Sequence, residues 1–410
     1  MTAESAVLNT RGVAIAADSA VTIGDRRIYY SGEKICHLSH RHSVGIMTCG
    51  NGMFMHIGWE LVFIEFGKFL GDRVPDTLEE YVNEFLKFLR DWEYISNMNC
   101  EYISDMDTNQ ANYFQTVIGI FFNRIKENYK LHFSKFIKKE NLTKRQKTDS
   151  LEKYFRKIRK NLEKEKSVSV YDGDVLVKKY LERITVVFLN VFSDFYINAT
   201  LKEEAIKLLI SFFSKMESPW WNNISSGIIF TGYGERELFP SAIDLDIIGK
   251  LGGKLYYTKP NKMDLLHESK SLIGTYAQTE VMQTFIRGID PYFEKLIFQQ
   301  LGKISKRLIK IAGKQYKEEI EEQKDDFIDK IKKHGDDNYL LPLKEIITTL
   351  PVNNLPEIAE ALVALTSLKR HMSTDEETVG GPTDVALITK TDGFVWVKRK
   401  VLYGDQAEQR

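Results

Sequence analysis

The 410-residue sequence has few cysteines and no long apolar run. Cys36, Cys49 and Cys100 form an odd, scattered set without a CxxC spacing, which excludes a disulfide framework and a cysteine-based metal site and is typical of a reducing compartment. No segment approaches the roughly 18 apolar residues that a membrane helix needs. The first thirty residues also lack the basic start and apolar core of a secretory signal. We therefore expect a cytoplasmic protein with no membrane partner.

The chain also lacks a charge of one sign. It has 57 Lys and Arg against 57 Asp and Glu, so its net charge gives no reason to expect nucleic acid as the main partner. One segment departs from this balance, because residues 124–166 hold sixteen Lys or Arg against six Asp or Glu. Such a run is more often a solvated helical face than a binding site, although contact with nucleic acid or an acidic partner stays open.

The remaining residues predict alternating blocks of strands and helices. Residues 5–17 read as a hairpin around Asn9-Thr10-Arg11-Gly12, and strands at 26–37 and 42–49 would complete a small antiparallel sheet in the opening fifty residues. From Met53 to about Trp92 the spacing is helical, with a break at 71–75. Later segments are expected as a helical block over 101–220, strands over 226–258, helices over 275–335 and 355–371, and strands over 384–389 and 393–398.

Three residues near the start form the sharpest constellation of potential chemistry. Thr2 opens the string MTAESAVLN, Asp18 lies in GVAIAADSAVT, and Lys34 follows sixteen residues later in YSGEKI. Asp18 and Lys34 alone could be a surface ion pair, and threonine is common at position two. Together, the spacings and the AADS string resemble the start of proteasome β-subunits and bacterial HslV-type peptidases. The resemblance covers about the first 55 residues, extends weakly to GGPTDVALITKTDG, and does not include the middle block.

The resemblance implies an α+β fold of the N-terminal-nucleophile class, a four-layer αββα sandwich. Residues 1–100 and 223–410 would form its core, with a helical, basic insertion at 101–222 and helical elaboration at about 275–345. It implies a threonine peptidase that cleaves peptide or protein substrates after removal of Met1. The Thr2 hydroxyl would attack, its own α-amine would take the proton, Lys34 would stabilise negative charge and Asp18 would hold Lys34. No metal or organic cofactor is expected.

Further positions follow from the same resemblance. The backbone N–H of Gly50, in Cys49-Gly50-Asn51-Gly52, is expected to stabilise the oxyanion. Val21 and Thr22 match the positions that bind substrate backbone and shape the pocket for the side chain before the scissile bond. Homo-oligomerisation is implied as well, and a separate ATPase would be needed to unfold protein substrates, because this chain has no GxxxxGK[ST] phosphate loop.

Some features depart from the family pattern. The family's serine in a GSG-like turn is replaced in the comparable string Gly232-Tyr233-Gly234, and Asp375, Glu376 and Glu377 all compete for the place of a late aspartate. A catalytically inactive assembly or scaffold protein, whose basic insertion binds a partner, is therefore the alternative. His37, His40 and His42 invite a metal site, but strand alternation would place His37 on the opposite face from the other two.

Overall fold

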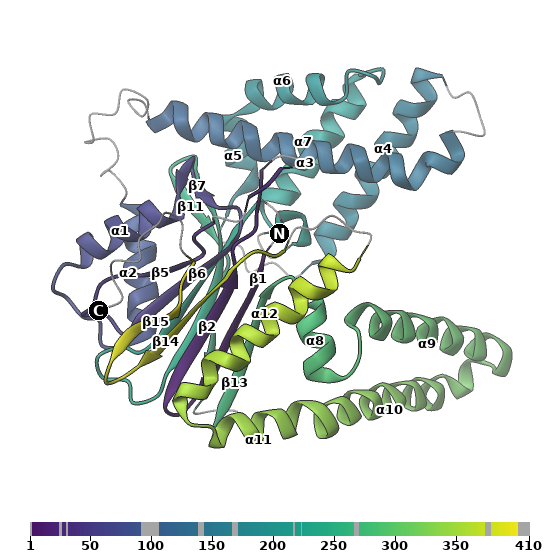
Figure 1. Cartoon of the computed structure of the whole chain (residues 1–410). Coiled ribbons are helices and arrows are strands. Elements are labelled where there is room, and N and C mark those ends of the chain that lie inside the picture. Colours follow the sequence, from purple (N-terminus) through teal and green to yellow (C-terminus); the bar gives the residue numbers. More distant parts are fainter. Residues whose placement is uncertain are drawn as a thin grey trace.

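The computed structural model describes residues 2–23, 27–29, 32–91, 106–137, 143–165, 171–215, 218–222, 224–265, 270–373 and 379–400. Its strands form two large antiparallel sheets and two short hairpins, and helices pack around them (Figure 1). The predicted α+β class is therefore confirmed. No helix in these ranges is both long and apolar enough to cross a lipid bilayer.

The first sheet has the strand order β13-β1-β2-β14-β15. Its strands β1 and β2 are buried along their whole length, which explains why they are mostly apolar and why polar residues occur in them only at Glu4, Ser5, Asn9 and Asp18. The turn at Thr10-Arg11 joins them, so the hairpin predicted over 5–17 is confirmed. The strands of this sheet are β1 (Ala3–Asn9), β2 (Gly12–Asp18), β13 (Ser271–Ala277), β14 (Thr383–Thr389) and β15 (Gly393–Lys398).

The second sheet has the order β11-β10-β9-β6-β5, and β12 pairs with β10. It is built from β5 (Ile35–His37), β6 (Val44–Gly50), β9 (Ser226–Gly232), β10 (Ser241–Leu251), β11 (Lys254–Tyr257) and β12 (Asn261–Asp264). The short hairpins pair β3 (Val21–Ile23) with β4 (Arg27–Tyr29), and β7 (Met53–Phe54) with β8 (Ile57–Gly58).

Three buried clusters define the layers. Alternate residues of the two sheets meet in one cluster, which includes Leu8 and Ile15 from the first sheet and Met47 and Ile229 from the second. The outer face of the second sheet is covered by α1 (Trp59–Leu70) and α2 (Leu78–Arg90). The outer face of the first sheet is covered mainly by α12 (Leu355–His371), with α8 (Glu280–Arg287) and α11 (Leu341–Thr349) beside it (Figure 1). The order of layers is therefore helices, sheet, sheet, helices.

The helical block has a core of its own. Aromatic and aliphatic side chains of its five helices pack together and against Ile248, Leu251 and Tyr256 of the second sheet, which anchors the block to β10 and β11. These helices are α3 (Met106–Ile137), α4 (Lys144–Lys164), α5 (Gly173–Lys179), α6 (Leu181–Val191) and α7 (Ala199–Phe213). Two further long helices, α9 (Pro291–Ala312) and α10 (Lys317–Gly335), form an antiparallel hairpin that projects from the sandwich (Figure 1).

Three predicted elements were wrong. The opening fifty residues do not form one sheet, because β1 and β2 lie in the first sheet whereas β5 and β6 lie in the second. The single strand expected over 26–37 is divided into β4 and β5. The helix expected from 275 begins only at Glu280, because residues 275–277 complete β13, which pairs with β1.

Candidate active site

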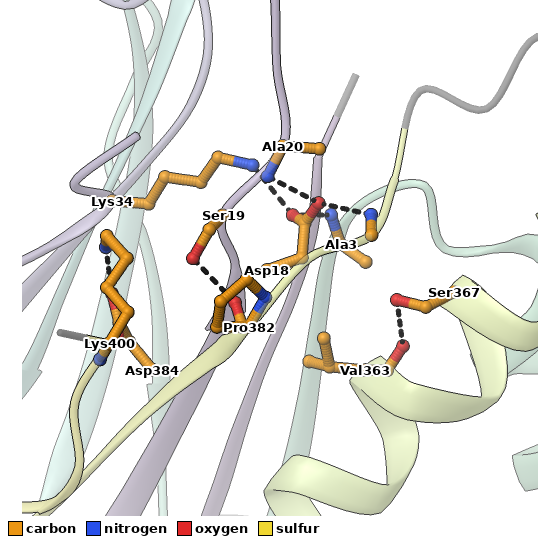
Figure 2. Close-up of polar contacts among 11 residues, drawn as sticks. Ala3, Asp18, Ser19, Ala20, Lys34, Val363, Ser367, Pro382, Asp384 and Lys400 are labelled. Carbon is orange, nitrogen blue, oxygen red and sulfur yellow. Dashed lines mark hydrogen bonds and ion pairs between the residues drawn. The ribbon is translucent and has the colours of Figure 1, made fainter. Parts of the chain in front are cut away.

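Asp18 is the centre of a buried polar cluster at the end of β2. Its Oδ1 accepts hydrogen bonds from Lys34 Nζ at 2.7 Å and from the Ala3 backbone nitrogen at 2.9 Å. Its Oδ2 accepts from the backbone nitrogens of Ala20 at 3.3 Å and Gly380 at 3.0 Å. Asp18 and Lys34 are 1% and 6% exposed, so this is a buried ion pair with a fully hydrogen-bonded carboxylate (Figure 2).

Thr2 lies directly before β1 and is buried. Its carbonyl oxygen accepts a hydrogen bond from the Gln278 backbone nitrogen at 3.0 Å, just after β13 ends at Ala277. Ala277 has a φ of 64°, a left-handed conformation that is uncommon for a residue with a side chain. The Ala3 backbone nitrogen and Lys34 Nζ donate to the same oxygen, Asp18 Oδ1. This shared acceptor links the peptide unit that follows Thr2 to the lysine ammonium.

The hairpin of β3 and β4 connects Asp18 to Lys34 along the chain. Gly32 N donates to the Ser19 carbonyl oxygen at 3.1 Å, so the hairpin returns to the residue after Asp18. Val21 pairs with Tyr29 and Thr22 with Ile28 within this hairpin. The two predicted substrate-binding positions therefore lie on a two-stranded ribbon whose base carries the ion pair.

Gly50 is the last residue of β6 and is exposed. Its φ of 77° is left-handed, and a Cβ on this residue would lie 2.7 Å from the Ser225 carbonyl oxygen, so glycine is required there. The end of β6 is tied to Lys34, because Thr48 N donates to the Lys34 carbonyl oxygen at 2.9 Å. Asp18 and Lys34 are thus in direct contact, Thr2 precedes the residue that shares Asp18 Oδ1 with Lys34, and Gly50 lies two residues after Thr48 on β6.

Glu4 is a residue of this region that sequence reasoning missed. It is the second residue of β1, two positions after Thr2, and it is 0% exposed. Neither carboxyl oxygen has a hydrogen-bond partner within the described ranges. Burial raises the pKa of Glu4 well above its usual range; Lys34 acts in the opposite direction and Asp18 adds to the rise. The available signal was the string AESAVL, where one carboxylate interrupts a buried strand.

Cys49 is the other nucleophilic side chain near this end of the sheets. Burial raises the pKa of its thiol well above the usual range, and the charges of Glu4 and Asp246 add to the rise. Its Sγ faces Gly227 of the neighbouring strand β9. The reactive form of cysteine is the thiolate, so this environment keeps Cys49 in its unreactive state at neutral pH.

The glycine string that was compared with the family's GSG-like turn lies away from Thr2. Gly232 pairs with Val44 at the start of β6, the opposite end of that strand from Gly50, so Gly232-Tyr233-Gly234 does not lie beside Thr2. A Cβ on Gly232 or Gly234 would collide with the backbone of Ser43 or Thr77, which explains both glycines by close packing. Asp375, Glu376 and Glu377 lie outside the described residues.

The three histidines do not form one cluster. The rings of His37 and His40 lie 5.9 Å apart, whereas His42 Nδ1 lies 2.7 Å from the Tyr81 hydroxyl on α2. Strand alternation does not apply to His40, because this residue lies in the turn between β5 and β6. Among the residues that the structure describes, no group of three or more His, Cys, Asp or Glu is placed to hold a metal ion.

Comparisons with known proteins add little to this geometry. No family model matches the sequence, and no curated protein matches it. Among solved structures, the chain is similar to the Anbu (Gly-1) mutant from Hyphomicrobium sp. strain MC1 at 9% identity, over 99% of this chain and 88% of that one. The TM-score of 0.29 is too low for that likeness to carry an argument about fold or activity.

Proposed function

We propose that this protein is an N-terminal-nucleophile amidohydrolase in which Thr2, exposed by removal of Met1, cleaves peptide bonds. The observation that carries this function is the shared oxygen of Asp18, which accepts hydrogen bonds from both Lys34 Nζ and the nitrogen that follows Thr2. A buried lysine is thereby held beside the first residues of β1. Two facing sheets between helices support the four-layer sandwich that belongs to this proposal.

The chemistry follows from the residue types. The free α-amine of Thr2, with a pKa of about 8, takes the proton of the Thr2 hydroxyl as the oxygen attacks the substrate carbonyl. The departing amine of the substrate receives that proton, which leaves an ester on Thr2. Water then attacks the ester, returns the proton to the threonine oxygen and releases the acid product. Amide and water are thus converted to acid and amine without another reactant.

The remaining site residues stabilise charge and position the substrate. The Lys34 ammonium favours proton loss from the Thr2 hydroxyl and stabilises the developing oxyanion, while Asp18 fixes its direction. The Gly50 N–H is the second oxyanion donor, and Val21 and Thr22 bind the substrate backbone. Self-assembly and a separate ATPase that delivers unfolded protein belong to the same hypothesis.

The test is intact mass of the purified protein before and after treatment with an electrophile that reacts only with an N-terminal amine and hydroxyl together. We expect the chain to lack Met1 and to gain one adduct, which Thr2→Ala abolishes. Thr10→Ala, in the turn at the far end of β1, is the matched control and should label like the wild type. A retained Met1, or labelling that survives Thr2→Ala, would refute the function.

A scaffold function is the second candidate, and the surface of α4 favours it. Lys153, Arg156, Lys157, Lys160 and Lys164 are all exposed on this helix. If Thr2 is inert, binding of this face to nucleic acid or an acidic protein becomes the function to test, with an affinity that falls steeply as salt rises. Salt-independent binding, or none, would leave the face as a solvated helical surface.

A further inference from the structure

The hairpin of α9 and α10 has almost no core of its own. In 22 residues of α9 only Ser305 is buried, and in 19 residues of α10 only Gly335 is buried. Neither helix therefore buries an apolar side chain completely within the chain. In proteins most helical stability comes from packing of an apolar face, so the hairpin is suited to a further covering surface.

The uncovered side of the hairpin is an apolar groove. It has a volume of about 530 Å³ and runs between the two helices. Ile304 and Leu308 line it from α9, and Tyr316 and Phe327 line it from the region of α10. These four side chains are 53%, 47%, 48% and 48% exposed. On α9, Leu301, Ile304 and Leu308 line the groove at spacings of three and four residues, which is the spacing of a helix-packing seam.

The exposed apolar area matches what a dimer interface needs. Aromatic side chains offer on the order of 200 Å² each and those of Ile and Leu are smaller, so the four at half exposure leave at most about 400 Å² of apolar surface. A standard interface buries about 800 Å² per partner, of which a little over half is apolar. The groove thus supplies about the apolar area of one side of a standard interface.

The charges on the two helices complement each other. Lys303, Lys306, Arg307 and Lys310 are exposed on α9, and within the described residues none of them forms an ion pair. On α10 the segment 318–329 contains seven Asp or Glu and one Lys. The ion pairs found there join α10 residues to one another, as in Lys330 with Asp326. The basic helix of one hairpin therefore suits the acidic helix of another.

We propose that the groove is covered by the same hairpin of a second copy of this chain, giving a two-fold symmetric four-helix bundle in which α9 of each copy lies beside α10 of its partner. The apolar grooves then close on each other, and the exposed cations of α9 meet the carboxylates of α10. A two-fold interface uses the same patch on both copies, so a hairpin that is basic on one helix and acidic on the other is self-complementary. This assembly does not depend on Thr2 being a nucleophile.

The first test measures the mass of the full-length chain in solution by sedimentation over a range of concentrations. The wild type should self-associate, and Ile304→Glu with Phe327→Glu should weaken the hairpin contact by about a hundredfold or more, because two charges enter each side of the apolar seam. Leu181→Glu, at an exposed leucine of α6, is the control and should associate like the wild type. Both targets are half exposed in the single chain, so circular dichroism should show that the variant still folds.

Charge reversal tests the pairing itself. Lys306→Glu with Lys310→Glu places carboxylates at two cationic positions and removes the net positive charge of α9, and Glu318→Lys with Glu322→Lys gives α10 a net positive charge. Each variant alone should associate about tenfold or more weakly than the wild type, while an equimolar mixture should recover, since opposite charges then face each other in both contacts. A wild-type monomer at tens of micromolar would overturn the proposal. So would association that is unchanged by the seam variant, or a mixture that shows no recovery.

Discussion

Substitution of Asp18 tests whether the ion pair with Lys34 is a buried structural and catalytic element or a dispensable contact. Asp18→Ala removes the acceptor of four hydrogen bonds, three of them from backbone nitrogens. It also leaves the Lys34 ammonium 6% exposed, and among the described residues its ion pair is with Asp18 alone. Removal of one partner from a buried pair costs about 3–5 kcal/mol, so we expect a loss of this size in the free energy of unfolding.

Urea unfolding at neutral pH measures this loss, with two comparisons built in. Asp72→Ala breaks the exposed pair with Arg41 and should cost no more than about 1 kcal/mol. Asp18→Ala combined with Lys34→Met removes the orphaned charge and should be more stable than Asp18→Ala alone. A loss below about 1 kcal/mol for Asp18→Ala, or a double variant less stable than the single one, would refute the reasoning.

Three further predictions concern the surroundings of the site. Because the pKa of Glu4 is raised, the folded state holds a proton that the unfolded state releases above about pH 4.3. The free energy of unfolding should therefore fall as the pH rises from there towards the folded pKa, by up to about 1.4 kcal/mol per pH unit. Urea unfolding of Glu4→Gln at several pH values should lack this slope. Cys49 should resist alkylation at pH 8 until the protein is unfolded, and Cys49→Ala should keep the Thr2 adduct; rapid native alkylation would contradict the raised thiol pKa. Gly232 has a φ of 128°, and a Cβ there would collide with the Ser43 carbonyl oxygen. Gly232→Ala should therefore lower the free energy of unfolding by about 2 kcal/mol or more but leave Thr2 labelling intact. Loss of labelling in folded protein would show that this turn contributes to the site.

Local sequence patterns predicted the positions of helices and strands better than they predicted which strands pair. The turn Asn9-Thr10-Arg11-Gly12 and the apolar residues on both sides were enough to find the first hairpin, and helical spacing found α1, α2 and α12. The same patterns do not tell which strands pair across long separations. β6 pairs with β9, whose residues lie about 180 positions later, and β1 gains β13 as its second neighbour. The assignment of the opening fifty residues to one sheet failed for that reason.

The sequence likewise identified some residues of the candidate site and missed or misplaced others. Thr2, Asp18 and Lys34 could be selected because a resemblance linked their spacings, and Asp18 and Lys34 are indeed paired. Glu4 was missed because glutamate is almost never fully buried, and the string AESAVL indicates a carboxylate within a strand but not whether that carboxylate has a partner. Gly232-Tyr233-Gly234 was misplaced because a short glycine motif carries no information about which end of a sheet it occupies. Its glycines are explained by the backbones that approach them.

The sequence predicted that α9 and α10 are helical, but not that the apolar side of their hairpin is exposed. Its apolar spacing is the same as that of a helix packed on a core, and periodicity cannot distinguish a side covered by the same chain from one left open. Only the exposure of Ile304, Leu308 and Phe327 separates these cases.

The central claim is that Thr2 forms an acyl-enzyme with the help of Lys34. The most direct measurement is peptide mapping of the ester formed when the protein is treated with an acylating β-lactone, in the wild type and in Asp18→Ala with Lys34→Met. We predict an ester on the hydroxyl of an N-terminal Thr2 in the wild type and a rate at least about a hundredfold lower in the folded double variant. An ester on another residue, or equal rates in both proteins, would contradict the account.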